Sequence, residues 1–365
     1  MKKFKVASFF AGVGGIDLGF ESTHAFKTIY ANEFDIYPAK TFESNFNINV
    51  DTRDIREIKA NEIPDFDVMI AGFPCQAFSI AGYRDGFDDK KGRGTLFFEL
   101  VRIIHVKKPR IIFLENVKNL VGHDNGNTFA TIIDALKQEG YIEKHSVLNS
   151  MEYGNVPQNR ERIYIVAFKN LEDYTNFDFP GPIRLTTKLE DIINFNYKVN
   201  KKYYYTKAKY KSDVYEKLVE ATKRDRNMHF IYQWRRKYVR KNKSHVIPTL
   251  TANMGEGGHN VPIVKTSRGI RKLTPIECFY AQGFPKNFVL PTDTSDAKLY
   301  KQAGNSVCVT VIKRIAENIN RSLMGEDTNK TVGITEDWIN FYLSNLNKDE
   351  QKIIKKMVKK WKTDN

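Results

Sequence analysis

The feature that most constrains the fold is an alternation of short apolar runs with helical patterns over the first 170 residues. The apolar runs predict strands at residues 5–10, 28–32, 68–71, 111–115 and 162–168, and helical spacing separates them at residues 37–45, 95–105 and 128–139. This alternation predicts an α/β fold with a mostly parallel, doubly wound sheet that is covered on both faces. Because ligands bind beyond the carboxyl ends of parallel strands, chemistry is expected in the residues that follow each strand.

From about residue 179 the pattern changes, which indicates a second domain. Prolines at positions 180 and 182 precede a basic, aromatic segment, and Pro248 precedes a glycine-rich stretch at residues 255–258. Helical signals return at residues 274–282 and 307–323. A further helix is predicted at residues 348–362, and we expect it to dock on the body through one apolar face: Ile353, Ile354, Met357, Val358 and Trp361.

Positive charge is concentrated in the second region. Between Lys198 and Lys243 the chain has sixteen Lys or Arg and four acidic residues, a net +12 of the formal +15 of the whole chain. Nine aromatic residues lie among them. Basic side chains offset phosphate charge and aromatic rings stack on bases, so this segment favours a nucleic-acid partner. The alternative is a soluble insertion with a charged, solvated face.

Cysteine usage and hydropathy exclude other classes of protein. The three cysteines are Cys75, Cys278 and Cys308, and none forms a C-x-x-C pair. This pattern disfavours a zinc site or a disulfide framework and indicates a reducing compartment; no metal is expected. No stretch approaches ~18 uninterrupted apolar residues, so no membrane span is expected and a cytoplasmic location is predicted.

A glycine loop at residues 12–15 follows the first predicted strand. It permits a tight strand-to-helix turn and close approach of the backbone to a ligand. A dinucleotide fingerprint would place a third glycine where Asp17 stands, which counts against a pyrophosphate cofactor. Glu33 follows the next strand and can accept hydrogen bonds from a ribose, with Phe34 beside it for adenine. Ribose and adenine without diphosphate favour S-adenosylmethionine; an ordinary strand–turn–helix loop is the alternative.

Four further residues follow strands or begin one. Cys75 is placed like a nucleophile, although a small buried residue is the more common fate of a cysteine. Glu115 at a strand's carboxyl end can keep a raised pKa and act as a proton donor, or simply cap a loop. Arg160 and Arg162 alternate on a strand and can converge on one site, or form a charged strand start.

Six motifs together resemble, in their order, the motif series of the DNA (cytosine-5)-methyltransferases. The resemblance covers roughly residues 4–323. The motifs are FAGVGG at 10–15, GFPCQ at 72–76, ENV at 115–117, QNRER at 158–162, RKLTP at 271–275 with QGFP at 282–285, and GNSV at 304–307.

The resemblance implies a Rossmann-like enzyme that methylates C5 of a flipped cytosine in double-stranded DNA with S-adenosylmethionine. It implies a catalytic and cofactor-binding domain at residues 1–178, a smaller target-recognition domain at 179–270 and a return segment at 271–325. The helical pattern of the tail adds a C-terminal helical extension at 326–365. A monomer is expected. We also expect a bacterial restriction-modification role, with a cognate endonuclease acting separately, or an orphan relative.

The resemblance also assigns residues. In the family the Pro-Cys cysteine attacks C6, so Cys75 is the expected nucleophile; Glu115 would face N3, Arg162 the cytosine carbonyl, and Arg160 would orient groups near the thiolate. The expected cofactor-binding residues are Phe10, Gly12, Gly14, Gly15, Glu33, Phe34, Asp54, Ile55, Pro74, Leu96 and Asn305. The expected DNA-binding residues are Gln76, Ser79, Arg93, Gln233, Arg235, Arg236, Arg240, Thr249 and Leu250.

Other functions remain as alternatives. A tRNA cytosine-5 methyltransferase is disfavoured by the long basic recognition region, and a non-catalytic DNA-binding relative by the full set of expected catalytic residues. A nicotinamide oxidoreductase is disfavoured by Asp17. An amino-methylating enzyme would need no thiol and would carry a Pro-Pro-aromatic loop in place of Pro74-Cys75.

Overall fold

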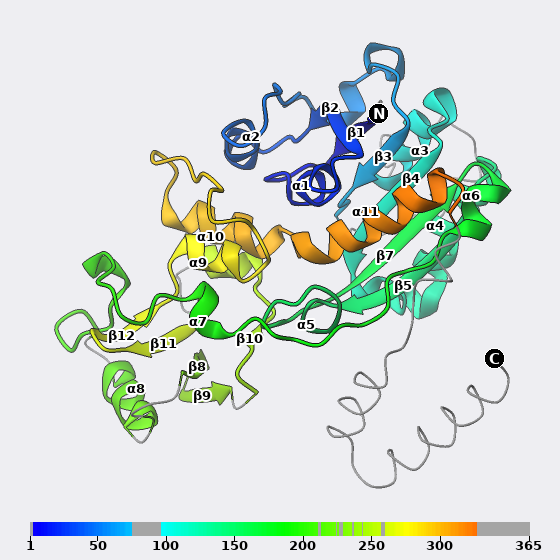
Figure 1. Ribbon diagram of the computed structural model, residues 1–365. Helices are drawn as coiled ribbons and strands as arrows, with labels where there is room; N and C mark the ends of the chain where they lie inside the picture. Colours follow the sequence, from blue (N-terminus) through cyan, green and yellow to red (C-terminus); the bar gives the residue numbers. More distant parts are fainter. Residues whose placement is uncertain are drawn as a thin grey trace, which may run out of the picture.

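A computed structural model of the chain describes residues 3–74, 96–210, 213–223, 225, 229–235, 237–242, 244–256 and 260–326. The chain forms a six-stranded sheet and a smaller four-stranded sheet. Figure 1 shows the larger sheet with helices on both sides and the smaller sheet at the other end of the molecule. Among these residues no helix combines the length and the apolar character that crossing a bilayer requires.

The six-stranded sheet has the order β2-β1-β3-β4-β7-β5. Its strands are β1 (Phe4–Phe9), β2 (Phe26–Asn32), β3 (Val68–Ala71), β4 (Ile111–Val117), β5 (Ile142–Asn149) and β7 (Glu161–Phe168). The first four are parallel, whereas β7 runs antiparallel to both of its neighbours. The predicted mostly parallel, doubly wound sheet is therefore confirmed.

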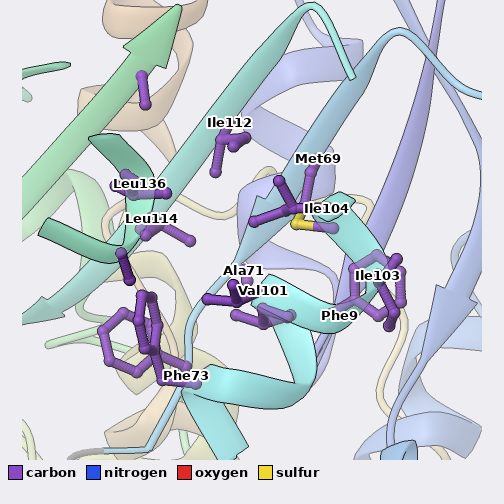
Figure 2. Packing of buried hydrophobic residues seen from close by; sticks show 14 of the residues in the cluster. Phe9, Met69, Ala71, Phe73, Val101, Ile103, Ile104, Ile112, Leu114 and Leu136 are labelled. Carbon is purple, nitrogen blue, oxygen red and sulfur yellow. The ribbon is translucent and has the colours of Figure 1, made fainter. Parts of the chain in front are cut away.

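Helices cover both faces of this sheet because side chains along each strand alternate between the faces. In β3, Val68 and Ile70 belong to the cluster formed with α1 (Gly15–Glu21) and α11 (Val309–Leu323). Met69 and Ala71 belong to the opposite cluster, with α3 (Leu96–Lys107) and α4 (Asn127–Gln138). Figure 2 shows this second cluster, in which Met69 and Ala71 lie against side chains of α3. Each fully buried aliphatic side chain contributes about 1.5–3 kcal/mol to folding.

The remaining helices are short and connect the two sheets or flank them. The α-helices are α2 (Ile36–Glu43), α5 (Ser150–Tyr153), α6 (Leu171–Asn176), α7 (Leu189–Ile192), α8 (Val214–Thr222), α9 (Pro275–Tyr280) and α10 (Asp296–Asn305). The 3-10 turns are η1 (Ile55–Glu57), η2 (Ala60–Glu62), η4 (Lys118–Leu120), η5 (His123–Gly126), η6 (Lys201–Tyr203) and η7 (Ala252–Gly255).

The four-stranded sheet is antiparallel, with the order β12-β11-β8-β9. It comprises β8 (Ile231–Arg235), β9 (Tyr238–Asn242), β11 (Ile263–Thr266) and β12 (Gly269–Lys272). Leu218 of α8 and Tyr232 of β8 lie in its own small core. β12 runs across residue 270, where a domain boundary is predicted.

One connection ties the second region to the large sheet. β10 (Ile247–Pro248) pairs in parallel with β6 (Gln158–Asn159), which directly precedes β7. After β10 the chain passes through η7 into β11 and β12 of the small sheet, and it then continues into α9, α10 and α11.

Several element boundaries differ from the sequence predictions. β1 ends at Phe9 because Phe10 has φ 51°, which no strand accommodates. The single helix predicted at 307–323 begins at Val309 and is preceded by a separate helix, α10. β5 was not predicted because this edge strand is polar and mostly half-exposed, so it lacks an apolar run. The predicted helix at 348–362 lies outside the described residues.

Candidate active site

A cavity of about 400 Å³ lies at the carboxyl edge of the six-stranded sheet. Its walls come from the ends of β1 to β4, from the start of β7, and from α10 with the turn after it. This volume falls in the range of small-molecule sites. The predicted site residues that line the cavity are Phe10, Gly12, Gly15, Glu33, Pro74, Glu115, Arg160, Arg162 and Asn305.

The loop after β1 has a backbone conformation that requires glycine at two positions. Gly12 and Gly14 have φ values of 55° and 83°, in the left-handed region that favours glycine. Gly14 is the N-cap of α1 and does not line the cavity itself. A Cβ on Gly15 would lie 2.8 Å from Ser306 Oγ, so glycine lets the turn after α10 approach the loop.

Glu33 connects this loop to the end of β2. Its carboxylate accepts hydrogen bonds from the backbone N–H of Gly12 at 2.8 Å and of Asp35 at 2.9 Å. Burial raises the pKa of Glu33, and these hydrogen bonds oppose the shift. The carboxylate is thus fixed in position beside the glycine loop, with remaining lone pairs for a hydroxylated ligand.

Two residues of the cavity wall carry a buried polar atom that no described group satisfies. Gln302 Oε1 accepts a hydrogen bond from Thr41 Oγ1 at 2.9 Å, which fixes the amide, whereas its Nε2 has no partner among the described residues. Ser306 Oγ is also buried without such a partner. Both residues line the cavity.

At the other side of the cavity, Glu115 and Arg162 form an ion pair. Glu115 Oε1 lies 3.1 Å from Arg162 Nε, and the glutamate is 8% exposed. Burial raises the pKa of Glu115, while Arg162 and then Arg160 oppose this shift. The neighbouring Asn116 donates its amide to the carbonyl of Phe73 at 2.9 Å, which holds the end of β3 against β4.

Arg160 and Arg162 are two residues apart, which predicts that their side chains share one face, but the two side chains have different partners. It is 1% exposed, and its guanidinium donates to the carbonyl oxygens of Leu250 at 2.8 Å, of Gly304 at 3.2 Å and of Ser306. Burial lowers the pKa of Arg160 to about 9, so its side chain is still a cation at neutral pH. Two of its nitrogens are therefore committed to backbone carbonyls.

Some predicted cofactor residues lie away from the cavity walls. Asp54 caps η1 and accepts a hydrogen bond from Arg56 Nε at 2.9 Å. Ile55 is buried in the core, Leu96 packs against that core, and Phe34 is 69% exposed. Five further residues with predicted roles lie outside the described residues: Cys75, Gln76, Ser79, Arg93 and Arg236.

The β8–β9 hairpin brings three predicted DNA contacts together. Gln233 pairs with Arg240 across the strands and Arg235 with Tyr238, so these side chains share one face of the hairpin. Arg235 and Arg240 are exposed. Thr249 is exposed and donates its hydroxyl to the carbonyl of Asn159 at 2.7 Å, whereas the Leu250 side chain is buried in the core.

The sequence did not indicate that Gln302 lines the cavity, nor that Asn116 bonds to the carbonyl of Phe73. Both stand beside residues that the motifs did identify, Asn305 and Glu115. A buried amide close to a motif residue is the signal that could have found them. Their hydrogen bonds join segments far apart in the sequence, and no local pattern gives such pairings.

The mostly parallel sheet, with a cavity at its carboxyl edge, has the Rossmann-like architecture of methyltransferases. Residues 4–321 match the family described as C-5 cytosine-specific DNA methylase, and the chain belongs to this family. It is similar to the Type II methyltransferase M.Bsp6I of Bacillus sp. (strain RFL6), with 59% identity over 320 residues, 88% of this chain and 99% of that protein. Identity to M.HhaI of Haemophilus parahaemolyticus is 38% over 322 residues, 86% of this chain and 93% of that protein.

Solved structures show the same fold at lower identity. A DNMT2 mutant of Spodoptera frugiperda has a TM-score of 0.65 and 22% identity, and the match covers 87% of this chain and 100% of that chain. A prophage-encoded E. coli protein described as a DNA modification methyltransferase has a TM-score of 0.58 and 19% identity, over 88% and 100% of the two chains. The chain is therefore a DNA (cytosine-5)-methyltransferase of the bacterial restriction-modification type.

Proposed function

We propose that the protein transfers a methyl group from S-adenosylmethionine to C5 of a flipped-out cytosine in double-stranded DNA, through a covalent bond between Cys75 and C6. Its role is that of the modification enzyme in a bacterial restriction-modification system, where it acts on DNA in the cytoplasm as a monomer. The observation that carries the proposal is the buried Glu115–Arg162 pair, which lines the same cavity as the glycine loop and Glu33.

The cavity residues divide into two groups in this proposal. The loop at residues 10–15, Glu33 and the end of α10 at Asn305 bind the cofactor. When bound, the cofactor supplies an electrophilic sulfonium methyl. Glu115 and Arg162 bind the cytosine ring, with the carboxyl facing N3 and the guanidinium facing the carbonyl oxygen.

C5 of cytosine is a poor nucleophile, so it has to be activated before it can take up the methyl group. A nucleophile of the enzyme that adds to C6 provides this activation. The Cys75 thiolate adds to C6, and the electron pair displaced toward N3 is neutralised by a proton from Glu115. C5 then carries enamine character and accepts the methyl group. Loss of the C5 proton and of the Cys75 sulfur restores the aromatic ring. A raised pKa at Glu115 supports this role because it extends the protonated form of the acid toward neutral pH.

The target base must leave the stack, since C6 is inaccessible to a side chain inside a duplex. The exposed face of the β8–β9 hairpin, with Gln233, Arg235 and Arg240, supports a recognition role for residues 179–270. Arginine and glutamine are suited both to phosphate contact and to reading base edges. In this assignment residues 1–178 and 271–325 form the catalytic domain and 326–365 an extension.

The test is bisulfite sequencing of genomic DNA from a methylation-free bacterium that expresses the protein. We expect protected cytosines at one position of one short sequence. Uniform conversion in cells that contain folded protein would contradict the proposed activity and favour an RNA substrate.

A further inference from the structure

Arg160 joins two segments that are far apart in the sequence. One is the segment at residues 249–251, which follows β10 within the recognition region, and the other is the turn at residues 304–306, at the C-terminal end of α10, which lines the cofactor cavity. A single guanidinium donates to the carbonyl of Leu250 in the first segment and to those of Gly304 and Ser306 in the second. Because it is planar and forked, a guanidinium holds such acceptors in one fixed arrangement.

Further hydrogen bonds hold the segment at residues 249–251 in this junction, the contact between that segment and the turn at residues 304–306. Gln158 is fully buried; its Oε1 accepts from the backbone N–H of Leu250 at 3.3 Å, and its Nε2 donates to the carbonyl of Ala281 at 2.9 Å. Thr249 Oγ1 donates to the carbonyl of Asn159 at 2.7 Å. The segment at residues 249–251, here called the recognition segment, is thus bonded to β6, which leads to Arg162 in the same cavity.

The two segments also touch directly. A Cβ on Gly304 would lie 2.1 Å from the carbonyl carbon of Thr251, so only glycine permits this approach of the two backbones. Asn305, the next residue, lines the cofactor cavity. A displacement of the recognition segment therefore has to move the turn that forms the cavity wall.

We propose, on the basis of the function proposed above, that Arg160 is a positioning residue that couples DNA recognition to cofactor binding, rather than a contact to the base. It fixes the Leu250 carbonyl against the turn at Gly304 and Ser306, so that the recognition segment and the cofactor cavity are set together. Arg162, whose Nε pairs with Glu115, is the arginine that meets the cytosine. The two arginines of the motif therefore have separate roles.

The first test compares Arg160→Lys with Arg162→Lys in the full-length protein. Lysine keeps the charge but cannot hold three carbonyls in a planar fork. We expect R160K to raise the dissociation constants of S-adenosylhomocysteine and of duplex DNA, each by about tenfold in calorimetry or fluorescence anisotropy. R162K keeps the affinity for S-adenosylhomocysteine and lowers the single-turnover rate. If R160K keeps both affinities within about twofold of wild type while kcat collapses, the proposal is overturned and Arg160 contacts the base.

The second test changes a residue of the segment at 249–251 instead of Arg160. It therefore tests the coupling even if R160K does not fold. Thr249→Val removes the hydroxyl donor to Asn159, although Thr249 does not line the cofactor cavity. We expect T249V to weaken S-adenosylhomocysteine binding about threefold in the absence of DNA. The matched control is Thr131→Val, which loses a similar bond to Asn127 in α4 and keeps wild-type affinity. Wild-type affinity in T249V would contradict the coupling.

The same titrations separate this inference from the proposed function. Wild-type protein that binds no S-adenosylhomocysteine contradicts the proposed function itself. Wild-type protein that binds both ligands, with affinities unchanged in both variants, overturns only the role given to Arg160.

Discussion

The carboxyl edge of the six-stranded sheet and the exposed face of the β8–β9 hairpin both carry arginines, but in opposite surroundings. At the sheet edge, Arg160 and Glu115 are buried, and their charges are offset by carbonyls or by an ion pair. On the hairpin, Arg235 and Arg240 face solvent. Burial changes the protonation equilibria of the first group, whereas exposed guanidinium groups serve as permanent charges for phosphate. In the proposed function, the buried charges therefore serve the chemistry and the exposed charges serve DNA recognition.

The largest expected effect is at the nucleophile. Cys75→Ala removes the only atom proposed to form a bond with C6, so methyl transfer measured with tritiated cofactor should vanish while duplex binding remains. The control is Cys278→Ala, since burial raises the pKa of the Cys278 thiol and leaves it protonated and inert. Loss of DNA binding together with turnover in Cys75→Ala would mean that the residue is structural.

The next effect concerns the buried acid. Glu115→Gln should lower the single-turnover rate by about 10²–10⁴-fold, because an amide cannot supply the proton at N3. The wild-type rate should fall as pH rises through the raised pKa of Glu115, since the protonated form is the active one, and the variant should lack this dependence. Glu161→Gln, at a partly exposed carboxylate on β7, is the control. A rate in Glu115→Gln equal to wild type would remove Glu115 as the acid.

A third effect concerns the stability of the sheet edge. Asp17 is fully buried and accepts hydrogen bonds from the hydroxyls of Ser8 and Thr28; burial raises its pKa to about 7. The folded state therefore keeps this proton between about pH 4 and 7 while the unfolded chain releases it, so stability falls as pH rises.

Measured against Asp17→Asn, the wild-type free energy of unfolding should decrease by about 2 kcal/mol between pH 5 and 8 in urea titrations. Asp134→Asn, at an exposed position of α4, should follow the wild-type profile. A constant difference between wild type and Asp17→Asn across this range would show that Asp17 has no raised pKa.

The smallest effect lies on the hairpin. Arg235→Gln and Arg240→Gln should each weaken duplex binding severalfold, and a residue that contacts phosphate should lower the salt slope of log Kd by about 1. Lys137→Gln, at an exposed position of α4, should leave both quantities unchanged. If neither hairpin variant alters affinity or salt slope, the face does not meet DNA and the contrast between the two regions fails.

Much of the catalytic edge was predictable because it depends on local patterns. Apolar runs located β1, β2, β3, β4 and β7, and the motifs and residues at their ends pointed to the glycine loop, Glu33, Glu115 and Arg162. Register and direction were less accessible: the antiparallel course of β7 depends on pairing with β4 and β5, and the polar pattern of β5 gives no strand signal.

Features that depend on distant contacts could not be predicted. The sequence places Arg160 and Arg162 on one face, yet Arg160 is directed to carbonyls that are supplied 90 and 144–146 residues later. Likewise, the unsatisfied amide of Gln302 becomes evident only when Thr41 is seen to fix its other end. Pairings of this kind are set by tertiary packing and not by local periodicity.

The most direct test of the central claim uses duplex DNA in which the target cytosine carries fluorine at C5. Fluorine cannot leave as a cation after methyl transfer, so the Cys75–C6 bond should persist. We predict a denaturation-resistant complex of protein and DNA in the presence of S-adenosylmethionine, with mass spectrometry placing the modified base on Cys75. Methylation of normal DNA without any such complex, or a complex on Cys278 or Cys308, would contradict the account.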